Sequence, residues 1–247
     1  MYKISVVFIL TVFSVKSFGQ AQSALPNQIR ASQTLDNISY LQTGELLYGI
    51  PQPEGKVIGD TYLNTNWLNS TIMLYEKEKL LEGYPLRYDI GLDELEIKGP
   101  KGVKVLRGDK VKSFVMLDSI TKKPLYYINA KEFKNEDNVT LTGFFQVLSD
   151  GPKPLFKKTS IKVKKSDYNV QFDVGSRDEK LLRKYDYFTT DGERVNEIPS
   201  SNKKLHLIFG DKSKEIEDFA KANNLNAKNE HHLKALFEHY NQLVQKS

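Results

Sequence analysis

The chain has 247 residues, a formal net charge of +5 and no cysteine. Hydrophobic residues make up 39% and charged residues 27%, a balance typical of folded globular proteins and unlike that of disordered ones. The lack of cysteine excludes disulfides, thiolate metal sites, a cysteine nucleophile and a lipid-modified N-terminal cysteine. The fold must therefore be stabilised by its core alone.

The first nineteen residues have the pattern of a secretory signal peptide. Met1-Tyr2-Lys3 is a short basic segment, an apolar run follows at 4–13, and Ser17-Phe18-Gly19 places small residues at the cleavage positions. The run is well short of the ~20 apolar residues of a bilayer span, so we favour cleavage over the alternative of a retained anchor. We expect export to the periplasm or the extracellular medium, with no membrane span after cleavage.

The rest of the chain divides into three parts by composition. Residues 20–55 are rich in Gln, Ser, Asn and Thr and have no sustained period, so we expect an extended N-terminal arm. Residues 56–199 carry strand and turn signals, and residues 200–247 carry helical periods. We predict an α+β fold that is mainly β: an antiparallel meander forming a curved sheet or partial barrel, followed by about three C-terminal helices that pack on or beside the sheet.

The clearest strands lie between residues 86 and 117. Apolar and polar residues alternate in three short runs, with the apolar positions at Leu86, Tyr88 and Ile90, at Leu95 and Ile97, and at Val103 and Val105. Glycine-containing turn sequences separate the runs at 91–93, 99–102 and 108–109. A period of two puts the apolar side chains on one face of a strand, so these runs predict an antiparallel meander.

Alternation continues later in the chain. It predicts strands at 125–130, 139–148 and 161–164, and a hairpin at 187–198 around Asp191-Gly192. It also predicts a strand at 168–174 in which one set of residues faces the core and the other faces solvent. The core set is Tyr168, Val170, Phe172 and Val174, and the solvent set is Asn169, Gln171 and Asp173.

Helical spacing begins after residue 201. Leu205, Ile208 and Phe209 share one face of a first helix that Gly210 ends, and Asp211 can cap a second helix that ends at Asn223-Asn224. A third helix from about residue 228 carries an apolar stripe that must pack on something, for which the sheet is the obvious partner. The stripe consists of Leu233, Leu236, Phe237, Tyr240 and Val244.

Several segments resemble a family of uncharacterised exported proteins of Bacteroidota. They are GDTYLNTNWL at 59–68, LRYDIGLDELEIK at 86–98, YNVQFDVGS at 168–176, LIFGDKSKEIEDF at 207–219 and HHLKALFEHYN at 231–241. The resemblance implies export and a β-rich body with a helical end, and it brings no activity, substrate or catalytic residue. Asp118-Ser119-Ile120 also looks like the O-glycosylation acceptor of that phylum, although we favour an ordinary turn there.

Motifs of catalysis and cofactor binding are absent from the sequence. There is no GxSxG elbow, no glycine-rich phosphate loop before a helix and no calcium loop. The four histidines, His206, His231, His232 and His239, include no pair at the i and i+4 spacing of a helical metal site. We therefore predict no cofactor, no metal site and no catalytic residue. Without the leader the chain carries 34 basic and 31 acidic side chains, and a net charge of +3 does not indicate a nucleic-acid partner.

Two clusters have a functional interpretation and a structural one. Carboxylates cluster at Asp89, Asp93, Glu94 and Glu96, and two acids that flank a cleft could catalyse glycoside hydrolysis. However, Glu94 and Glu96 alternate with apolar residues, as on the solvent face of a strand. Trp67, the single tryptophan, lies near Tyr62, and the pair has the chemistry to stack on a sugar or a base. For both clusters we favour the structural interpretation.

The strongest functional signal is a lysine-rich segment at 152–165, PKPLFKKTSIKVKK, which contains six lysines and no acid. Lys158, Lys162 and Lys164 share parity, so on a strand they project from one face while Ile161 and Val163 occupy the other. Such a ridge would bind an anionic glycan, a lipid headgroup or a nucleic acid by charge. The alternative is a solvated strand face, or an edge that lysines protect against aggregation.

These observations favour a non-catalytic binding or envelope-associated module with Lys158, Lys162 and Lys164 as its binding residues. An anionic glycan or a lipid headgroup is the candidate partner. The alternatives are a hydrolytic enzyme, which would require a deep pocket with convergent titratable groups, and a structural or assembly protein, which a large exposed apolar patch would favour.

The first prediction concerns the leader. Because the small residues end at Gly19, the mature protein should begin near Gln20, or at Gln22 if cleavage follows Ala21. N-terminal sequencing or intact mass of the natively expressed protein measures this directly. A retained Met1, or a protein found entirely in the cytoplasm, would contradict it.

Overall fold

The computed structural model describes residues 54–190, 192, 194–199 and 201–245. The chain divides into two compact units, 1–53 and 54–247, and the described residues all belong to the second. The predicted signal peptide (1–19) and nearly all of the predicted arm (20–55) lie outside the described residues.

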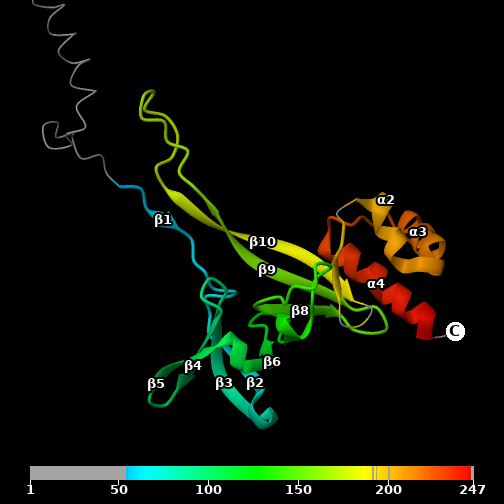
Figure 1. Ribbon diagram of the computed structural model, residues 1–247, viewed down its shortest axis with the longest axis horizontal. Helices are drawn as coiled ribbons and strands as arrows, with labels where there is room; N and C mark the ends of the chain where they lie inside the picture. Colours follow the sequence, from blue (N-terminus) through cyan, green and yellow to red (C-terminus); the bar gives the residue numbers. More distant parts are fainter. Residues whose placement is uncertain (1–53, 191, 193, 200, 246–247) are drawn as a thin grey trace, which may run out of the picture. The chain divides into compact units, whose positions relative to one another are not determined.

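The second unit is mainly β, as predicted (Figure 1). Within the described residues, eleven strands form one open, mixed sheet. They are β1 (Val57–Ile58), β2 (Leu68–Leu74), β3 (Leu80–Asp89), β4 (Glu94–Gly99), β5 (Gly102–Arg107), β6 (Val111–Leu117), β7 (Pro124–Asn129), β8 (Phe144–Ser149), β9 (Leu155–Lys164), β10 (Glu179–Thr190) and β11 (Val195–Glu197).

The strands do not follow one continuous meander. Their order is β1-β10-β9-β8-β7-β6-β2-β3-β4-β5, with β11 paired to β10, so β6 returns to β2 instead of continuing beyond β5. The buried residues Ile72 and Phe114 are partners in that β2–β6 pairing, whereas Val103 and Val105 of the edge strand β5 are more than half exposed. Pairing β6 with β2 buries the apolar side chains of β6 and leaves β5 at the edge, which explains the strand order. All neighbouring strands are antiparallel except β1 and β10.

Within the described residues, the α-helices longer than one turn are α3 (Ser213–Ala222) and α4 (Glu230–Gln245), where about three helices were predicted. The expected first helix is a single turn, α2 (Asn202–Leu205), that continues into the 3₁₀ segment η6 (His206–Lys212). Gly210, at φ 54° and ψ −126°, leaves the helical region and prevents a longer helix. Three further 3₁₀ turns, η3 (Glu76–Glu78), η4 (Gly108–Lys110) and η5 (Ala130–Glu132), connect strands. No helix in the described part has the length and apolar content needed to cross a membrane.

Three clusters of buried side chains form the core. One lies among β2, β3, β4, β6 and β7 and includes the stacked rings of Phe114 and Tyr127, whose centroids are 4.6 Å apart. The other two cover opposite faces of the sheet where β9 and β10 meet β8. The helices pack on one face over Leu155, and Phe145 and Phe156 stack on the other. Figure 1 shows the helices beside one end of β9 and β10.

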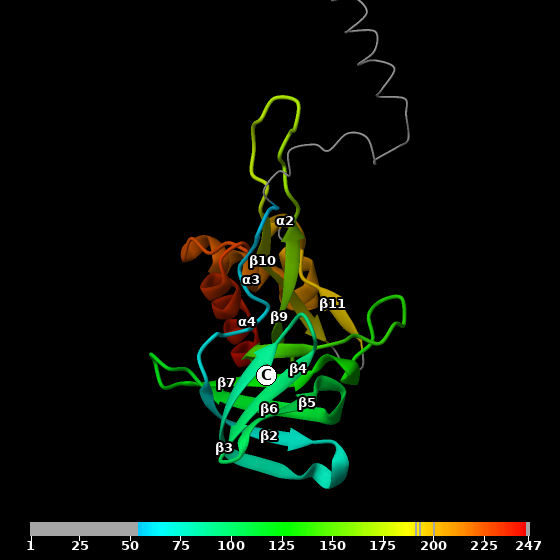
Figure 2. The same cartoon turned by 90° about the vertical axis from the view of Figure 1, so that its left-hand side faces the viewer.

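Beyond this double-covered base, β9 and β10 continue as a hairpin arm, which we define as residues 159–184. The β8 pairing ends at Lys158, while the β9–β10 ladder runs on to Lys164 and Lys180. In both ribbon views the arm projects away from β8 (Figures 1 and 2). Among the described residues, the short strand β1 is the one further strand that pairs with the arm, at Glu179 and Lys180. The arm is thus built from residues whose side chains are largely exposed.

The predicted strand at 168–174 is wrong. Residues 170–173 form the turn at the end of the arm, and Val170, Phe172 and Val174 are 66%, 71% and 58% exposed. The side-chain oxygen of Asn169 accepts hydrogen bonds from the backbone N–H groups of Gln171 and Phe172, which closes the turn. This local hydrogen bonding outweighs the alternation of the sequence.

The second prediction uses the contrast between two phenylalanines. Phe145 is fully buried and Phe172 is 71% exposed. Phe145→Ala should lower the free energy of unfolding by about 3 to 5 kcal/mol, whereas Phe172→Ala should change it by no more than about 0.5 kcal/mol. Urea titration of both variants measures the difference, and equal losses of stability would contradict the placement of residues 168–174.

Candidate functional site

The lysines of the arm gather on one face of the β9–β10 ladder. Residues paired directly across antiparallel strands project from the same face, and the register pairs Lys164 with Lys180 and Ser160 with Lys184. Lys162 lies between these pairs and has the same parity. Lys162, Lys164, Lys180 and Lys184, all exposed, therefore share what we call the basic face.

Two of the four cations on the basic face have ionic partners. Lys164 lies 3.2 Å from Asp167 and Lys184 lies 2.9 Å from Asp186. Within the described residues, Lys162 and Lys180 take part in no ion pair. The basic face thus presents more positive charge than its own carboxylates neutralise.

Lys158 does not belong to this surface. Although it shares parity with Lys162 and Lys164, it lies at the base of the arm, where β8 still pairs with β9 and places Phe145 opposite it. Its side chain is half-buried, and burial lowers the pKa of its amine, against the opposing influence of Asp186 and Asp93. The three predicted binding residues are therefore divided between an exposed face and a cavity.

The cavity beside Lys158 has a volume of about 310 Å³ and lies where β8 begins. Its lining brings Lys158 near Tyr88 of β3 and Asp93 of the β3–β4 turn. The Tyr88 hydroxyl donates a 2.8 Å hydrogen bond to Asp93, and burial together with this carboxylate raises the pKa of Tyr88. The cavity therefore combines an amine, a carboxylate and a phenol, which are groups that an enzyme site would use.

The predicted carboxylate cluster is mostly engaged in structure. Asp89 is buried and accepts hydrogen bonds from the Thr61 hydroxyl and from the backbone N–H groups of Gly91 and Leu92. Glu96 accepts from both Arg87 and Tyr62, and the bond from Arg87 holds the pKa of Glu96 below its usual value. Asp89 and Glu96 thus fix the β3–β4 turn and its neighbours.

Trp67 and Tyr62 both contact the side chain of Arg87. The guanidinium of Arg87 is 4.3 Å from the ring of Trp67 and 4.4 Å from the ring of Tyr62. Cation–π contacts of this kind contribute about 0.5 to 1 kcal/mol at exposed sites, and Glu96 holds the guanidinium in place. The structural interpretation of the two aromatic rings is therefore the one that the structure supports.

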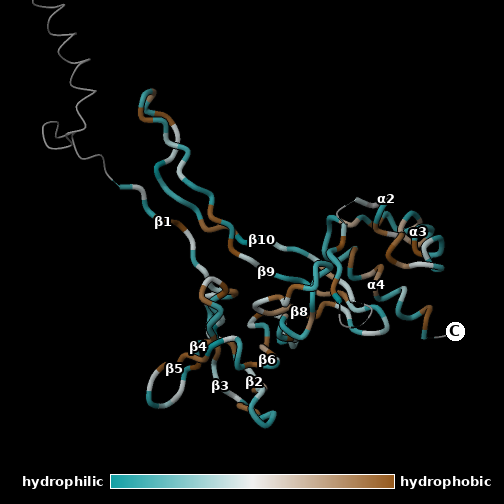
Figure 3. The backbone as a smooth tube through the Cα atoms, in the orientation of Figure 1, coloured by the Kyte–Doolittle hydropathy of each residue, from teal (hydrophilic) through white to brown (hydrophobic). Residues whose placement is uncertain are grey.

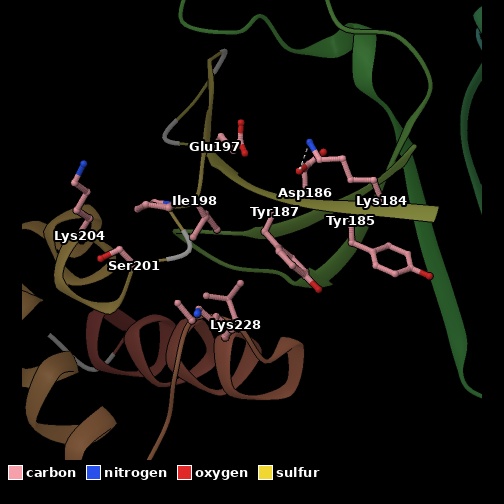
Figure 4. A pocket seen from close by; sticks show the side chains of 12 residues that line it. Lys184, Tyr185, Asp186, Tyr187, Glu197, Ile198, Ser201, Lys204 and Lys228 are labelled. Carbon is pink, nitrogen blue, oxygen red and sulfur yellow. Dashed lines mark ion pairs between the residues drawn. The ribbon is translucent and has the colours of Figure 1, made fainter. Parts of the chain in front are cut away.

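A hollow of about 750 Å³ lies between β10, β11 and the helices (Figure 4). Tyr187 points from β10 toward α4, and its hydroxyl donates a 2.9 Å hydrogen bond to Glu230. Lys184 and Asp186 project from the opposite face of the strand, where they form their ion pair. Tyr187 and Glu230 thus bind each other beside this hollow, and the Lys184–Asp186 ion pair lies on the other face of the strand.

The described histidines have individual places on the helices. The ring of His239 stacks on Phe219 at 3.9 Å, His232 contacts Asn226, and His231 is exposed. The side chain of His206 lies outside the described part. Among the described residues, no group of three or more His, Cys, Asp or Glu side chains has the arrangement of a metal site.

The sequence analysis missed Lys180 and Lys184 of the basic face. Both belong to the first half of β10, which was not predicted as a strand because the sequence KLLRK at 180–184 has no alternation of apolar and polar residues. The predicted turn at Asp118-Ser119-Ile120 is present, because Asp118 accepts hydrogen bonds from Ile120 and Thr121, and its glycosylation stays a prediction.

No family model, curated protein or solved structure matches this chain. The resemblance to exported proteins of Bacteroidota therefore stays a prediction.

The third prediction follows from the lowered pKa of Lys158. In the unfolded chain the Lys158 amine keeps its proton up to a pH of about 10.5, whereas in the folded protein it loses the proton at a lower pH. The buried positive charge therefore destabilises the fold at pH values below the folded-state pKa, and this cost is relieved as the pH rises toward 10.5. As the pH rises from 7 to 10.5, the free energy of unfolding of the wild type should rise relative to that of Lys158→Met. Urea titrations at several pH values measure this difference.

Lys162→Met is the control, because it removes an exposed lysine from the same strand and corrects for the change in net charge. A stability difference between wild type and Lys158→Met that stays constant over the whole range would show that the amine is solvated as it is in the unfolded chain.

Proposed function

We propose that this chain is an exported, non-catalytic binding module that holds a polyanion of the cell envelope on the basic face of its arm. The shared chemistry of the ligand is a row of negative charges, as presented by an anionic glycan or by the headgroups of anionic lipids. Charge attraction supplies most of the affinity of such contacts and makes it depend on salt.

The observation that carries the proposal is the register of the arm. It places Lys164 directly opposite Lys180, and like charges in that position destabilise a sheet. Asp167, 3.2 Å from Lys164, offsets part of this repulsion, and a bound anion would offset more of it. Since Lys162 is the next residue of the same face, three cations lie within two successive positions of the ladder, a spacing suited to a repeating anionic chain or surface.

The arm is also suitable for binding because of its position. Lys162, Lys164 and Lys180 lie beyond the end of the β8 pairing, on the part of the arm that projects away from β8 in both ribbon views (Figures 1 and 2). Binding requires no opening of the core.

The enzyme alternative retains one supporting observation, the cavity beside Lys158 with Asp93 and Tyr88. Lys158→Met separates the two functions. It alters the cavity and leaves the basic face in place, so polyanion binding should persist in this variant.

The fourth prediction concerns the basic face. The triple variant Lys162→Gln/Lys164→Gln/Lys180→Gln should lose retention on a heparin column at low salt. If the wild type is retained, the slope of log affinity against log salt should fall by roughly 2 to 3 in the variant, because about one counterion is released per cationic contact. Its unfolding free energy should stay within about 0.5 kcal/mol per substitution of the wild-type value.

The matched control is Lys204→Gln/Lys214→Gln/Lys228→Gln. These three lysines are exposed on the helical part and, within the described residues, form no ion pair. This variant should keep the wild-type elution. If the two triple variants lose retention equally, or if the wild-type protein passes through the column, the basic face is a solvated strand surface and not a binding site.

A further inference from the structure

The end of the arm is an ordered turn, which we call the arm tip and define as residues 166–177. Backbone hydrogen bonds join Asp167 to Ser176 at 3.1 Å and Asn169 to Val174 at 2.8 Å. The carboxylate of Asp167 accepts a further hydrogen bond from the N–H of Ser176. These hydrogen bonds within the tip hold its backbone in a defined conformation.

Despite this order, the tip displays its apolar side chains to solvent. Val170, Phe172 and Val174 are 66%, 71% and 58% exposed, and Figure 3 shows apolar residues returning at the end of the arm. The lone Phe of the group is a large apolar ring held away from the core, an arrangement that costs hydration free energy. Exposed apolar residues gathered on one projecting element indicate a surface that is covered when the protein works.

Charged groups within the tip are neutralised locally. The Tyr168 hydroxyl donates to Asp173 and also accepts from Arg177, whose guanidinium lies 4.1 Å from the centre of the Tyr168 ring. Asp173 and Arg177 are 3.8 Å apart. A carboxylate that is paired in this way costs less to bring near an apolar phase than an isolated one.

Glycine is required at one position of the tip. Gly175 has φ +95°, and a Cβ there would lie 2.4 Å from the carbonyl oxygen of Asp167. The shape that displays the apolar side chains is thus a defined conformation of the backbone.

The shape of the tip favours a bilayer over a protein as the partner. A stable protein interface buries about 800 Å² on each side with complementary shape, and three side chains on a convex turn cannot supply that area. A bilayer surface needs no complementary pocket, since it accepts apolar side chains to a depth of about 5 to 10 Å.

The charges behind the tip match the headgroups of anionic lipids. Lys162, Lys164 and Lys180 of the basic face lie where the ladder enters the tip, and Lys165 follows them without a strand partner. The arm thus has apolar residues at its end and lysines behind them. When the tip enters a bilayer, the apolar residues reach the hydrocarbon and the lysines lie at the level of the phosphates. A bilayer of neutral lipids would bind the apolar tip but would not attract the lysines.

We infer that the arm tip inserts Val170, Phe172 and Val174 into the surface of a bilayer that contains anionic lipid, while the basic face contacts the lipid phosphates. The inference rests on the proposed function and commits its polyanion to a lipid surface. It adds an apolar contribution that a soluble polyanion such as heparin does not provide.

The test compares two ligands and three variants. The ligands are vesicles of phosphatidylcholine with one quarter phosphatidylglycerol, assayed by co-sedimentation, and immobilised heparin. Val170→Ser/Phe172→Ser should lower the vesicle partition coefficient at least tenfold and leave heparin elution unchanged. The basic-face triple variant should lose both. The control Leu92→Ser/Leu207→Ser, which alters apolar side chains 69% and 71% exposed outside the arm, should lose neither.

The outcomes separate the two proposals. If the tip variant sediments with vesicles like the wild type while the lysine variant does not, the apolar insertion is wrong and charge binding stands. Wild-type retention on heparin without vesicle binding also overturns the insertion. If the wild type binds neither ligand, the proposed function itself fails. Thermal unfolding of each variant checks that the fold is intact.

A fluorescence measurement reports insertion independently of affinity. Trp67 is the single tryptophan, so Trp67→Phe removes the native signal and Phe172→Trp places a new one at the tip. On adding the anionic vesicles, the emission of Trp at position 172 should shift to the blue and be quenched by brominated acyl chains. Emission that stays that of a hydrated indole while the protein sediments would place the tip outside the bilayer.

Discussion

The β9–β10 ladder is the constraint on which the second unit depends. At its base both faces are covered, by the cluster of Phe156 and Phe188 on one side and by that of Leu155 and Tyr187 on the other. Burial of side chains this large stabilises by roughly 1.5 to 3 kcal/mol each, so the base fixes the pairing register. A shift of one residue would exchange the two faces. The same register continues into the arm, where it determines which side chains are displayed to solvent.

Polar contacts fix the ladder to its neighbours. Asn241 of α4 is buried, donates to the carbonyl oxygens of Asp150 and Lys153 and accepts from the N–H of Lys153 at 2.9 Å, which joins the helix to the β8–β9 turn. On the arm, Arg183 donates to Asp60 at 2.7 Å and to the carbonyl oxygen of Tyr62. Because a buried polar group left without a partner costs about 1 to 3 kcal/mol, the Asn241 contacts make the position of α4 specific.

Sequence reasoning succeeded where the signals were local. The runs around Leu86 and Leu95 are strands with those residues fully buried, since alternation, turn glycines and burial agree there. It failed at 168–174, because alternation does not reveal that Asn169 hydrogen-bonds to its own turn. The return of β6 to β2 depends on pairing between distant segments. The separation of Lys158 from Lys162 depends on where the β8 pairing ends, which the parity of a single strand does not indicate.

The basic face has a simpler explanation, the protection of an open sheet edge by lysines, and the topology allows the two to be weighed. Beyond Lys158 the outer edge of β9 is free of β8, so Lys162 and Lys164 are placed as edge protection requires. Lys180 does not protect an open edge, because β1 already pairs with β10 at that residue. Protection also fails to explain why Lys180 faces Lys164 at the cost of repulsion, or why the turn beyond them exposes Phe172 instead of hiding it. An arm that served only to prevent association would not end in an apolar tip, whereas an arm that binds an anionic lipid surface would combine exposed lysines with exposed apolar side chains.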